Sequence, residues 1–494
     1  MRTIQFKILL LSLFIVFSCS NDDDNPQDQG TTTPEAPINS DQNIDQFIWK
    51  GMNAAYLYKA NVGDLANNRF NTNQEFFQFL SKFKSPETLF NGLKSTNPED
   101  RFSFIVDDYI ALEQAFSGIS KSNGIDFGLS LVSQDSDDVI GFIRYILPGT
   151  DAEAKGLKRG DLFNAVNGVK LTRNTDFNTI FGQDSYSINL INITNGTIVE
   201  TGQNVSLTKA QYTENPIFIA KTIEYQGQKI GYLMYNSFVG NFDAQLNEAF
   251  GKFKTDGIGD LILDLRYNGG GSVRTAIDIS SMITGQFNGE IFSKEIWNDE
   301  LQNQFSSGAD GEEALINRFK NTIRTGEQIN SLGLTKLHVL ATNRTASASE
   351  LVINGLEPYI DVIQIGELTT GKFQASVTLY DSQGFGREGA NSAHTYAIQP
   401  LVLKSANKNG VTDFVNGLTP DLMFKENISS MGVLGEIDEP FLKTALDFIV
   451  NGTALTATSK NGFTNDIIDW ETKALLPNYQ RMYKDNFTFS SINK

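Results

Sequence analysis

Only one cysteine and two histidines occur among the 494 residues of this chain, so the residue types on which zinc, haem and thiol chemistry depend are almost absent. A single cysteine excludes a disulfide framework, and the sequence contains neither a CxxC nor an HExxH motif. With only 12 prolines and no Gly-x-y period, the chain is not a fibrous protein. These absences remove a large share of the possible chemistry before any motif is considered.

Basic residues are also in the minority. The 40 Lys and Arg residues face 58 Asp and Glu residues, and the resulting net charge of −18 repels phosphate backbones, so nucleic acid is not expected as a partner. Hydrophobic residues make up 40% of the chain, with 36 Phe and 15 Tyr, which is ample for packed cores and excludes a disordered protein. The length exceeds what one core normally supports, so we expect two or three folded units.

Residues 1–18 have the pattern of a signal peptide. Arg2 and Lys7 precede an apolar stretch from Ile8 to Phe17, which is too short to span a bilayer. The following Ser18-Cys19 completes a segment that resembles a bacterial lipobox, and this resemblance implies that Cys19 is lipidated and becomes the first residue of the mature chain. The alternative is a secreted protein in which Cys19 is incidental.

Residues 19–40 are predicted to form a disordered tether, because they contain almost no apolar side chains. The acidic run Asp22-Asp23-Asp24 resembles the surface-export signal of lipoproteins in the Bacteroidetes group, although a plain solvated linker has the same composition. We therefore expect a protein of the cell envelope that is lipid-anchored to the outer membrane and faces either the periplasm or the cell surface. The membrane is expected as a partner only through this anchor.

The pattern of apolar residues divides the remaining chain into four parts. Residues 41–118 show helical spacing of apolar residues and are predicted to form a helical N-terminal domain. Residues 119–208 consist of short apolar runs broken by glycine, which indicates a compact β domain, and residues 209–450 alternate strands with helices, which indicates an α/β fold. Residues 451–494 form a C-terminal extension. The polar stretch from Phe287 to Thr335 is interpreted as a lid or a surface excursion.

The β domain resembles a PDZ domain of the protease-associated type. The resemblance lies in the turns Pro148-Gly149, Gly160-Asp161 and Asn167-Gly168, which surround a short helix and a hairpin. It implies that an upstream glycine-containing edge binds the carboxyl terminus of a peptide by strand addition. The residues at that edge are Phe127, Gly128, Leu129 and Ser130. A generic β domain with coincidental turns is the alternative.

Two segments of the α/β part carry candidate chemistry. An apolar strand, Leu261–Leu265, runs through Arg266 into three consecutive glycines at Gly269–Gly271, where backbone N–H groups either bind an anion or form a plain turn. Ser347 lies in Thr345-Ala346-Ser347-Ala348-Ser349-Glu350 at the start of a predicted helix. There it is either an N-cap or a nucleophile beside the positive end of the helix dipole.

Lys372 follows 25 residues later, after an apolar strand. A lysine buried in a dry site loses its proton readily and can serve as the base for a serine hydroxyl, whereas an isolated lysine is normally a surface charge. A Ser/His/Asp arrangement is the rival within catalysis. His338 lies in an apolar strand and is expected in the core. His394 stays open as the histidine of such an arrangement.

The order of these segments resembles the carboxyl-terminal processing (tail-specific) serine proteases, over about residues 100 to 450. The resemblance implies a crotonase-like ββα spiral core with a PDZ-like domain, a Ser347 nucleophile, a Lys372 general base, and backbone N–H groups of Gly271 and Ala348 as oxyanion donors. Many members orient the lysine with a Gln four residues later, where this chain has Ser376, so Gln374 or Ser376 is the candidate third member. The family needs no metal or organic cofactor.

The implied reaction is endopeptidase cleavage of proteins or peptides recognised through an apolar C-terminal segment. The alternative is a non-catalytic lipoprotein that binds peptides or other ligands on the surface while keeping the protease fold. The sequence does not fix the oligomeric state, which stays open.

Overall fold

The computed structural model describes residues 40–194, 197–452, 466–485 and 487. The expected signal peptide, the lipidation residue Cys19 and the tether up to residue 39 lie outside the described residues, and these three stay predictions. Among the described residues, no helix is both long and apolar enough to cross a membrane.

The N-terminal region is helical, as the apolar spacing predicted. Buried Ile44, Phe47, Ile48 and Met52 recur on one face of α1 and form part of a hydrophobic core. Helix α3 begins with a capping box between Ser85 and Thr88, which satisfies free backbone N–H groups of its first turn. The elements are α1 (Ser40–Ala55), η1 (Lys59–Asn61), η2 (Gly63–Leu65), α2 (Asn73–Leu80), α3 (Pro86–Gly92), β1 (Phe104–Val106) and α4 (Tyr109–Phe116).

An antiparallel unit follows, with a core of its own around Phe127, Phe163 and Phe181. Its main sheet has the strand order β23-β3-β4-β5-β7-β8, and β2 pairs with β9. Positive φ at Asn167 and Gly168 forms the tight turn between β5 and β6 that this dipeptide predicts. The elements are β2 (Ile119–Ser122), β3 (Ile125–Leu131), β4 (Val139–Ile146), α5 (Asp151–Ala154), β5 (Leu162–Val166), β6 (Val169–Lys170), α6 (Phe177–Gly182), β7 (Ser185–Thr194), β8 (Thr197–Thr208) and β9 (Ala210–Thr213).

A six-stranded sheet forms the centre of the α/β part. Its order is β10-β11-β12-β16-β17-β22, with β10 antiparallel and the other strands parallel. The strands are β10 (Ile217–Tyr225), β11 (Gln228–Tyr235), β12 (Asp260–Asp264), β16 (Lys336–Ala341), β17 (Asp361–Gly366) and β22 (Leu422–Met423). The four strands expected from the sequence, near residues 229–238, 261–267, 336–342 and 361–366, are β11, β12, β16 and β17.

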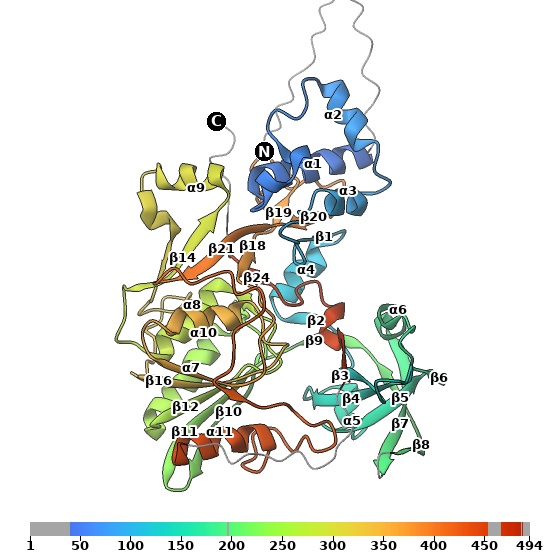
Figure 1. Ribbon diagram of the computed structural model, residues 1–494, viewed down its shortest axis with the longest axis vertical. Helices are drawn as coiled ribbons and strands as arrows, with labels where there is room; N and C mark the ends of the chain where they lie inside the picture. Colours follow the sequence, from blue (N-terminus) through green and yellow to red (C-terminus); the bar gives the residue numbers. More distant parts are fainter. Residues whose placement is uncertain (1–39, 195–196, 453–465, 486, 488–494) are drawn as a thin grey trace, which may run out of the picture. The chain divides into compact units, whose positions relative to one another are not determined.

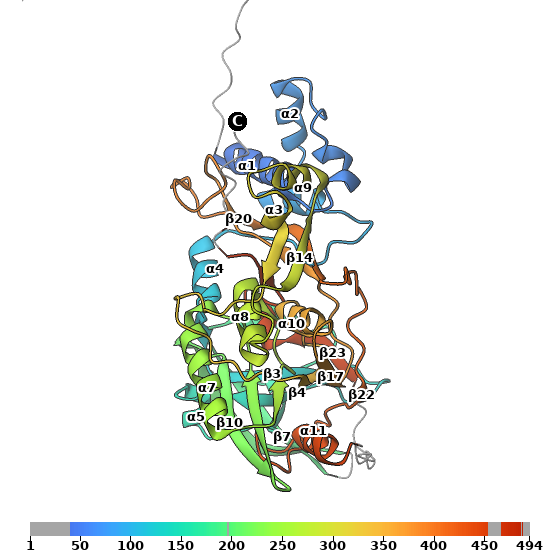
Figure 2. The same ribbon diagram turned by 90° about the vertical axis from the view of Figure 1, so that its left-hand side faces the viewer.

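Helices cover both faces of this sheet (Figure 1). Alternate strand residues such as Leu261, Leu263 and Val339 pack in one core with α7 (Asp243–Asp256), α8 (Val273–Ile283) and α10 (Ala348–Leu356). The intervening Ile262 and Leu340 pack with α11 (Pro440–Asn451) in another core. Helices α8 and α10 lie side by side (Figure 2). Both faces of the sheet are therefore buried, which explains the continuous apolar runs in its strands.

A second six-stranded sheet lies beyond α8 and α10. Its order is β13-β24-β18-β21-β14-β15, and its strands are β13 (Gly271–Ser272), β14 (Ile291–Trp297), β15 (Ile316–Arg318), β18 (Gln374–Ser376), β21 (Leu401–Asn407) and β24 (Met482–Tyr483). A small three-stranded sheet joins β1 to β20 (Ala397–Gln399) and β19 (Leu379–Tyr380).

The interpretation of residues 287–335 as a lid or surface excursion is wrong for its strands. This stretch supplies β14 and β15 to the second sheet and also contains α9 (Asp299–Ser306) and η4 (Gly311–Leu315). Phe292 and Trp297 are buried, and β14 pairs with β21, more than a hundred residues later. The polar composition of the surrounding residues concealed these strands.

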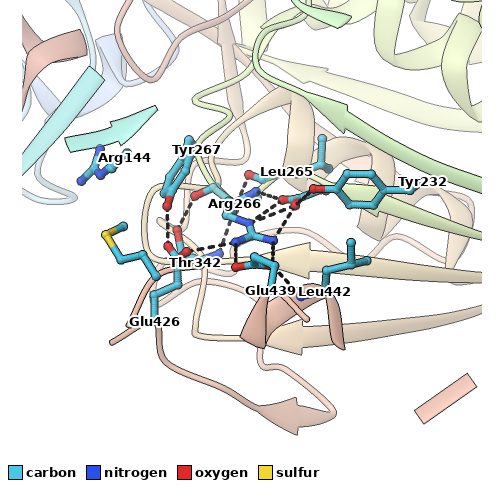
Figure 3. A network of polar contacts seen from close by, with 12 residues as sticks. Arg144, Tyr232, Leu265, Arg266, Tyr267, Thr342, Glu426, Glu439 and Leu442 are labelled. Atoms are coloured by element: carbon cyan, nitrogen blue, oxygen red, sulfur yellow. Dashed lines mark hydrogen bonds and ion pairs between the residues drawn. The ribbon is translucent and has the colours of Figure 1, made fainter. Parts of the chain in front are cut away.

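Arg266, two residues after the end of β12, is fully buried in a network of carboxylates (Figure 3). Its guanidinium contacts Asp264 and donates to Glu439 Oε1 at 2.8 Å and Glu426 Oε1 at 3.0 Å. Glu439 also caps α11 by accepting from Leu442 N at 2.7 Å. Arg266 thus ties the end of β12, and the glycine loop that follows it, to α11.

The C-terminal segment joins the antiparallel unit to the α/β part. Strand β23 (Asp466–Glu471) pairs antiparallel with β3, η5 (Thr472–Leu475) follows, and β24 lies between β13 and β18 in the second sheet. Residues 466–483 are therefore an integral part of two sheets. The label of C-terminal extension did not anticipate this role.

Candidate active site

Ser347 occupies the junction between the central sheet and α10. It is the N-cap residue of α10, six residues after the end of β16, and it is fully buried. Its backbone has φ 68° and ψ −114°, a conformation that a residue with a side chain rarely adopts. Backbone strain of this kind is concentrated at functional sites, where surrounding contacts hold it in place. The helix N-terminus also brings unpaired N–H groups and positive dipole to this spot.

Lys372 lies beside Ser347, with its Nζ atom 3.3 Å from Ser347 Oγ. The lysine is fully buried and also donates to the carbonyl oxygen of Gln374 at 2.9 Å. Burial lowers the pKa of Lys372 well below its usual range, and the nearby Arg481 guanidinium lowers it further, against the opposing effect of Glu350. A neutral amine within reach of a serine hydroxyl is the arrangement that a general base requires.

Glu350 connects the two residues through their backbones. Its Oε2 accepts from Ser347 N at 2.7 Å and from Lys372 N at 2.9 Å, while its Oε1 accepts from Gly371 N at 2.7 Å. The Thr369 hydroxyl donates to Oε1 as well. Burial raises the pKa of Glu350, and these hydrogen bonds oppose that rise. Glu350 was not among the predicted site residues, although Ser-x-x-Glu at a helix start is a known capping signature.

Of the predicted oxyanion donors, Ala348 is the first residue of α10, and Gly271 begins β13. The glycine that lies against the nucleophile is Gly270. A Cβ atom on Gly270 would lie 2.7 Å from Ser347 Cβ and 2.9 Å from Ala348 N, so only glycine fits there. On Gly271 it would meet the carbonyl oxygen of Phe238 at 2.3 Å instead. The three-glycine loop therefore brings its backbone into the site, and its assignment as an oxyanion site stays a prediction.

The candidates for a third member lie on β18. Gln374 reaches Lys372 through its main-chain carbonyl group, while its side chain donates to the Tyr58 hydroxyl at 2.8 Å. The Ser376 hydroxyl donates to the carbonyl of Met482 at 3.2 Å. Both side chains thus have partners other than Lys372. The group that accepts from the Lys372 amine is the main-chain carbonyl of Gln374. The identity of the residue at position 374 does not reveal such a contact, because every residue has this carbonyl group.

The two histidines lie apart from this pair. His338 is buried in β16, as expected, and burial lowers its pKa to about 4. His394 Nε2 lies 3.1 Å from Asp381 Oδ2. Among the described residues neither histidine forms a hydrogen bond with Ser347, so the geometry gives the Ser/His/Asp rival no support. The described residues also contain no group of three His, Cys, Asp or Glu side chains that could hold a metal ion.

Two models of known protein families match parts of this chain. Residues 229–422 match the model of peptidase family S41, and residues 43–104 match the model of the peptidase S41 N-terminal domain. The chain belongs to peptidase family S41. It is a serine-type peptidase of the carboxyl-terminal-processing kind.

Several relatives of this S41 peptidase share most of its length. It is 25% identical over 361 residues to the carboxyl-terminal-processing protease of Picosynechococcus, covering 72% of this chain and 76% of the relative. It is 22% identical over 377 residues to the chloroplastic C-terminal processing peptidase of Tetradesmus obliquus, covering 71% and 73%. The crystal structure of a putative S41 protease from Bacteroides fragilis has the same fold, with a TM-score of 0.63 and 22% identity over 82% of this chain and 97% of that one.

The predicted peptide-binding edge of the S41 peptidase is well formed. Phe127, Gly128, Leu129 and Ser130 all lie on β3 and are buried. One side of β3 pairs with β4 and the other with β23, so a strand of the same chain occupies the edge that strand addition would use. No local signal in the sequence predicted this pairing, because its two strands are more than three hundred residues apart.

Proposed function

We propose that this S41 peptidase is an endopeptidase with a Ser347/Lys372 dyad, and that it cleaves proteins recognised through their C-terminal segment. The observation that carries this proposal is the separation of 3.3 Å between Lys372 Nζ and Ser347 Oγ in a site where both residues are fully buried. The Lys372 amine is in its neutral form when it acts as the base, because burial disfavours the charged form and lowers its pKa. No step of this reaction requires a metal or an organic cofactor.

The geometry supports the following course of reaction. The Lys372 amine accepts the proton of the Ser347 hydroxyl as Oγ attacks the scissile carbonyl carbon. Backbone N–H groups of Ala348 and Gly271 are proposed to stabilise the oxyanion, and the protonated lysine then delivers its proton to the leaving amine. Water, deprotonated by the same lysine, hydrolyses the acyl-enzyme. The strain at Ser347 and the four donors on Glu350 fix the nucleophile and base before substrate arrives.

The antiparallel unit is proposed to act as a PDZ-like domain. Its strand β3, with Gly128 at its centre, would accept an apolar C-terminal segment of a substrate by strand addition on the side where β23 now pairs. The N-terminal sequence supports attachment to the outer membrane through lipidated Cys19, facing the periplasm or the cell surface. These assignments are part of the proposal and rest on the sequence resemblance.

The test uses the chain from Ser20 to Lys494, with Ser347→Ala and Lys372→Ala as paired variants, and an unfolded protein with an apolar C-terminus as substrate. We expect cleavage by the parent, loss of cleavage in both variants, and no effect of EDTA. Cleavage that survives Ser347→Ala, or that EDTA abolishes, would overturn the dyad. A matched substrate with an acidic C-terminus tests the recognition step separately.

A further inference from the structure

Strand β23 occupies the peptide-binding edge in a specific way. It runs antiparallel to β3, with Ile467 opposite Ser130 and Glu471 opposite Gly128. The Thr472 hydroxyl then bonds to both backbone groups of Phe127, accepting from its nitrogen at 2.9 Å and donating to its oxygen at 3.1 Å. The chain's own segment therefore lies where a bound peptide would add a strand.

The half-buried Trp470 packs against three aromatic rings of the antiparallel unit, which are called the aromatic pocket below. Its ring lies 5.2 Å from the ring of Phe181, 5.6 Å from that of Phe177 and 5.8 Å from that of Phe127, measured between centroids. Its Nε1 donates to Asn178 Oδ1 at 3.0 Å. The pocket thus offers three apolar walls and one acceptor, a combination that recognises a large aromatic side chain.

The next residue, Glu471, fills a carboxylate subsite. It forms a buried ion pair with Arg144, and Arg344 Nε lies 3.8 Å from its Oε2. Gly128 makes room for this pair, because a Cβ atom there would lie 2.7 Å from Arg144 Nη2. Arg144 also lies 3.6 Å from the buried carboxylate of Asp126, but Glu471 is the carboxylate that faces both arginines, so its removal would leave this buried cluster with an excess of positive charge.

The place beside β3 that β23 occupies, called the groove from here on, is connected to the nucleophile. Arg344 precedes Ser347 by three residues and donates to the carbonyl of Ile468, in the middle of β23, at 3.1 Å. The loop that carries the nucleophile therefore contacts whatever strand lies on β3.

Beyond the groove, the same segment continues into the active site. Lys473 Nζ donates to the carbonyl of Tyr267 at 3.2 Å, next to the glycine loop. A Cβ atom on Gly270 would lie 2.9 Å from the carbonyl oxygen of Arg481 and 2.7 Å from Ser347 Cβ, so this carbonyl lies close to the nucleophile. Met482 then pairs with Gly271 of β13, and β24 lies between β13 and β18, the strand that begins two residues after Lys372. A substrate strand would need this same place.

We propose that the edge of β3 is a peptide site with an aromatic subsite followed by a carboxylate subsite, that its resident ligand is the chain's own β23, and that a substrate must displace this segment to reach Ser347. The consequence for cleavage rests on the proposed function, whereas the peptide site does not. The ligand is a peptide strand with an aromatic residue followed by a carboxylate. That carboxylate is either an acidic side chain or the terminal α-carboxylate.

One residue of the segment opposes its docked position, although its guanidinium also lies over the Phe104 ring. Arg481 is held near Lys372, and its Nε has no hydrogen-bond partner among the described residues. Burial lowers the pKa of Arg481 to about 10, so the docked position disfavours the charge of the guanidinium. Release of the segment would return this cation to water.

The binding test uses the chain from Ser20 to Lys494 with Ser347→Ala, so that no peptide is cleaved. Trp470→Ala weakens the resident strand, and Trp49→Ala is the matched control, because Trp49 is another partly buried tryptophan whose Nε1 donates to a carbonyl. The probe is a fluorescent, N-acetylated peptide with the sequence Asp-Ile-Ile-Asp-Trp-Glu and an amidated C-terminus. If the resident strand fills the groove in most molecules, freeing it strengthens probe binding at least about tenfold in the Trp470 variant and leaves the Trp49 variant unchanged.

Two further probes identify the source of the carboxylate. Replacement of the probe's Glu by Gln removes the side-chain carboxylate and should weaken binding about tenfold or more. A probe that ends at Trp with a free carboxyl group tests the terminal source. Equal binding of the Glu and Gln probes, or no gain from Trp470→Ala, would overturn the proposal.

Thr472→Val provides a second way to loosen β23 if Trp470→Ala unfolds, and it should strengthen probe binding in the same direction. With Ser347 restored, both variants should cleave an unfolded protein faster than the parent. Tighter probe binding without any cleavage would leave the peptide site standing and refute the proposed function. A parent chain that cuts off its own residues beyond Arg481, with an intact Ser347→Ala chain, would show a substrate in place of a resident ligand and overturn the displacement step.

Discussion

Replacement of Glu350 by glutamine tests whether one buried carboxylate aligns both members of the dyad. Each of its oxygens accepts two hydrogen bonds, and the donors include the backbone nitrogens of Ser347 and Lys372. The amide nitrogen of a glutamine cannot accept. Facing Ser347 and Lys372, it would leave two buried N–H groups without an acceptor, whereas on the other side it would leave only Gly371 N, because the Thr369 hydroxyl can turn and accept from it. An unsatisfied buried donor costs about 1–3 kcal/mol, so Glu350→Gln should lower the free energy of unfolding by at least about 1–3 kcal/mol.

The effect on catalysis should exceed what lost stability explains. Lys372 Nζ and Ser347 Oγ are 3.3 Å apart, and a shift of either atom that lengthens this separation should lower kcat about 10²-fold, with a smaller change in KM. The negative charge of Glu350 also raises the pKa of Lys372. Its removal lowers that pKa, so the neutral amine persists to lower pH and the acid limb of the kcat profile should move toward lower pH.

The assay combines urea unfolding with kcat and KM measured across the acid limb, at a temperature where each variant is folded. Glu357→Gln is the control, because Glu357 lies just past the end of the same helix and is exposed. A Glu350→Gln enzyme that is less stable but keeps the parent kcat and pH profile would refute the positioning role. Such a result would leave Glu350 as a purely structural cap.

Three other predictions use single measurements. The kcat/KM should rise with pH, because only neutral Lys372 accepts the hydroxyl proton, and EDTA should leave the profile unchanged; a profile flat across the neutral range would contradict this role. Gly270→Ala should reduce kcat by about 10²-fold, since its Cβ would lie 2.7 Å from the nucleophile's Cβ. Gly168→Ala is the control, because Gly168 also has a positive φ but has open space where a Cβ would lie. This variant should change only the free energy of unfolding, by about 1 kcal/mol. Arg266→Met should lower the free energy of unfolding in urea by about 3–5 kcal/mol, because it leaves buried carboxylates unpaired. Arg318→Met, which breaks a surface pair, should cost below about 1 kcal/mol, and equal losses would refute the contrast.

The α/β architecture and the helical N-terminal region could be predicted from the sequence, because their signals are local. Apolar spacing identified α1, and continuous apolar runs identified β12 and β16, whose two faces are both buried. The juxtaposition of Ser347 and Lys372 came from motif order. Periodicity alone would not place two residues 25 positions apart in hydrogen-bonding distance.

Other features had no local signal. Strands β23 and β24 are short, and their partners lie hundreds of residues earlier, so their pairing depends on the tertiary fold. The group that holds the Lys372 amine is the main-chain carbonyl of Gln374, which any residue would supply. The role of Gly270 depends on a close approach of two loops, and sequence alone could not distinguish it from the neighbouring Gly271.

The position of β24 also constrains the order of folding. Met482 and Tyr483 of β24 lie between β13, which begins at Gly271, and β18, which begins just after Lys372. The strand that completes this sheet therefore comes later in the chain than every other strand in it. During synthesis the preceding elements emerge first, and contacts of such high sequence separation form slowly. The dyad would therefore be assembled in its final surroundings only after nearly the whole chain has emerged.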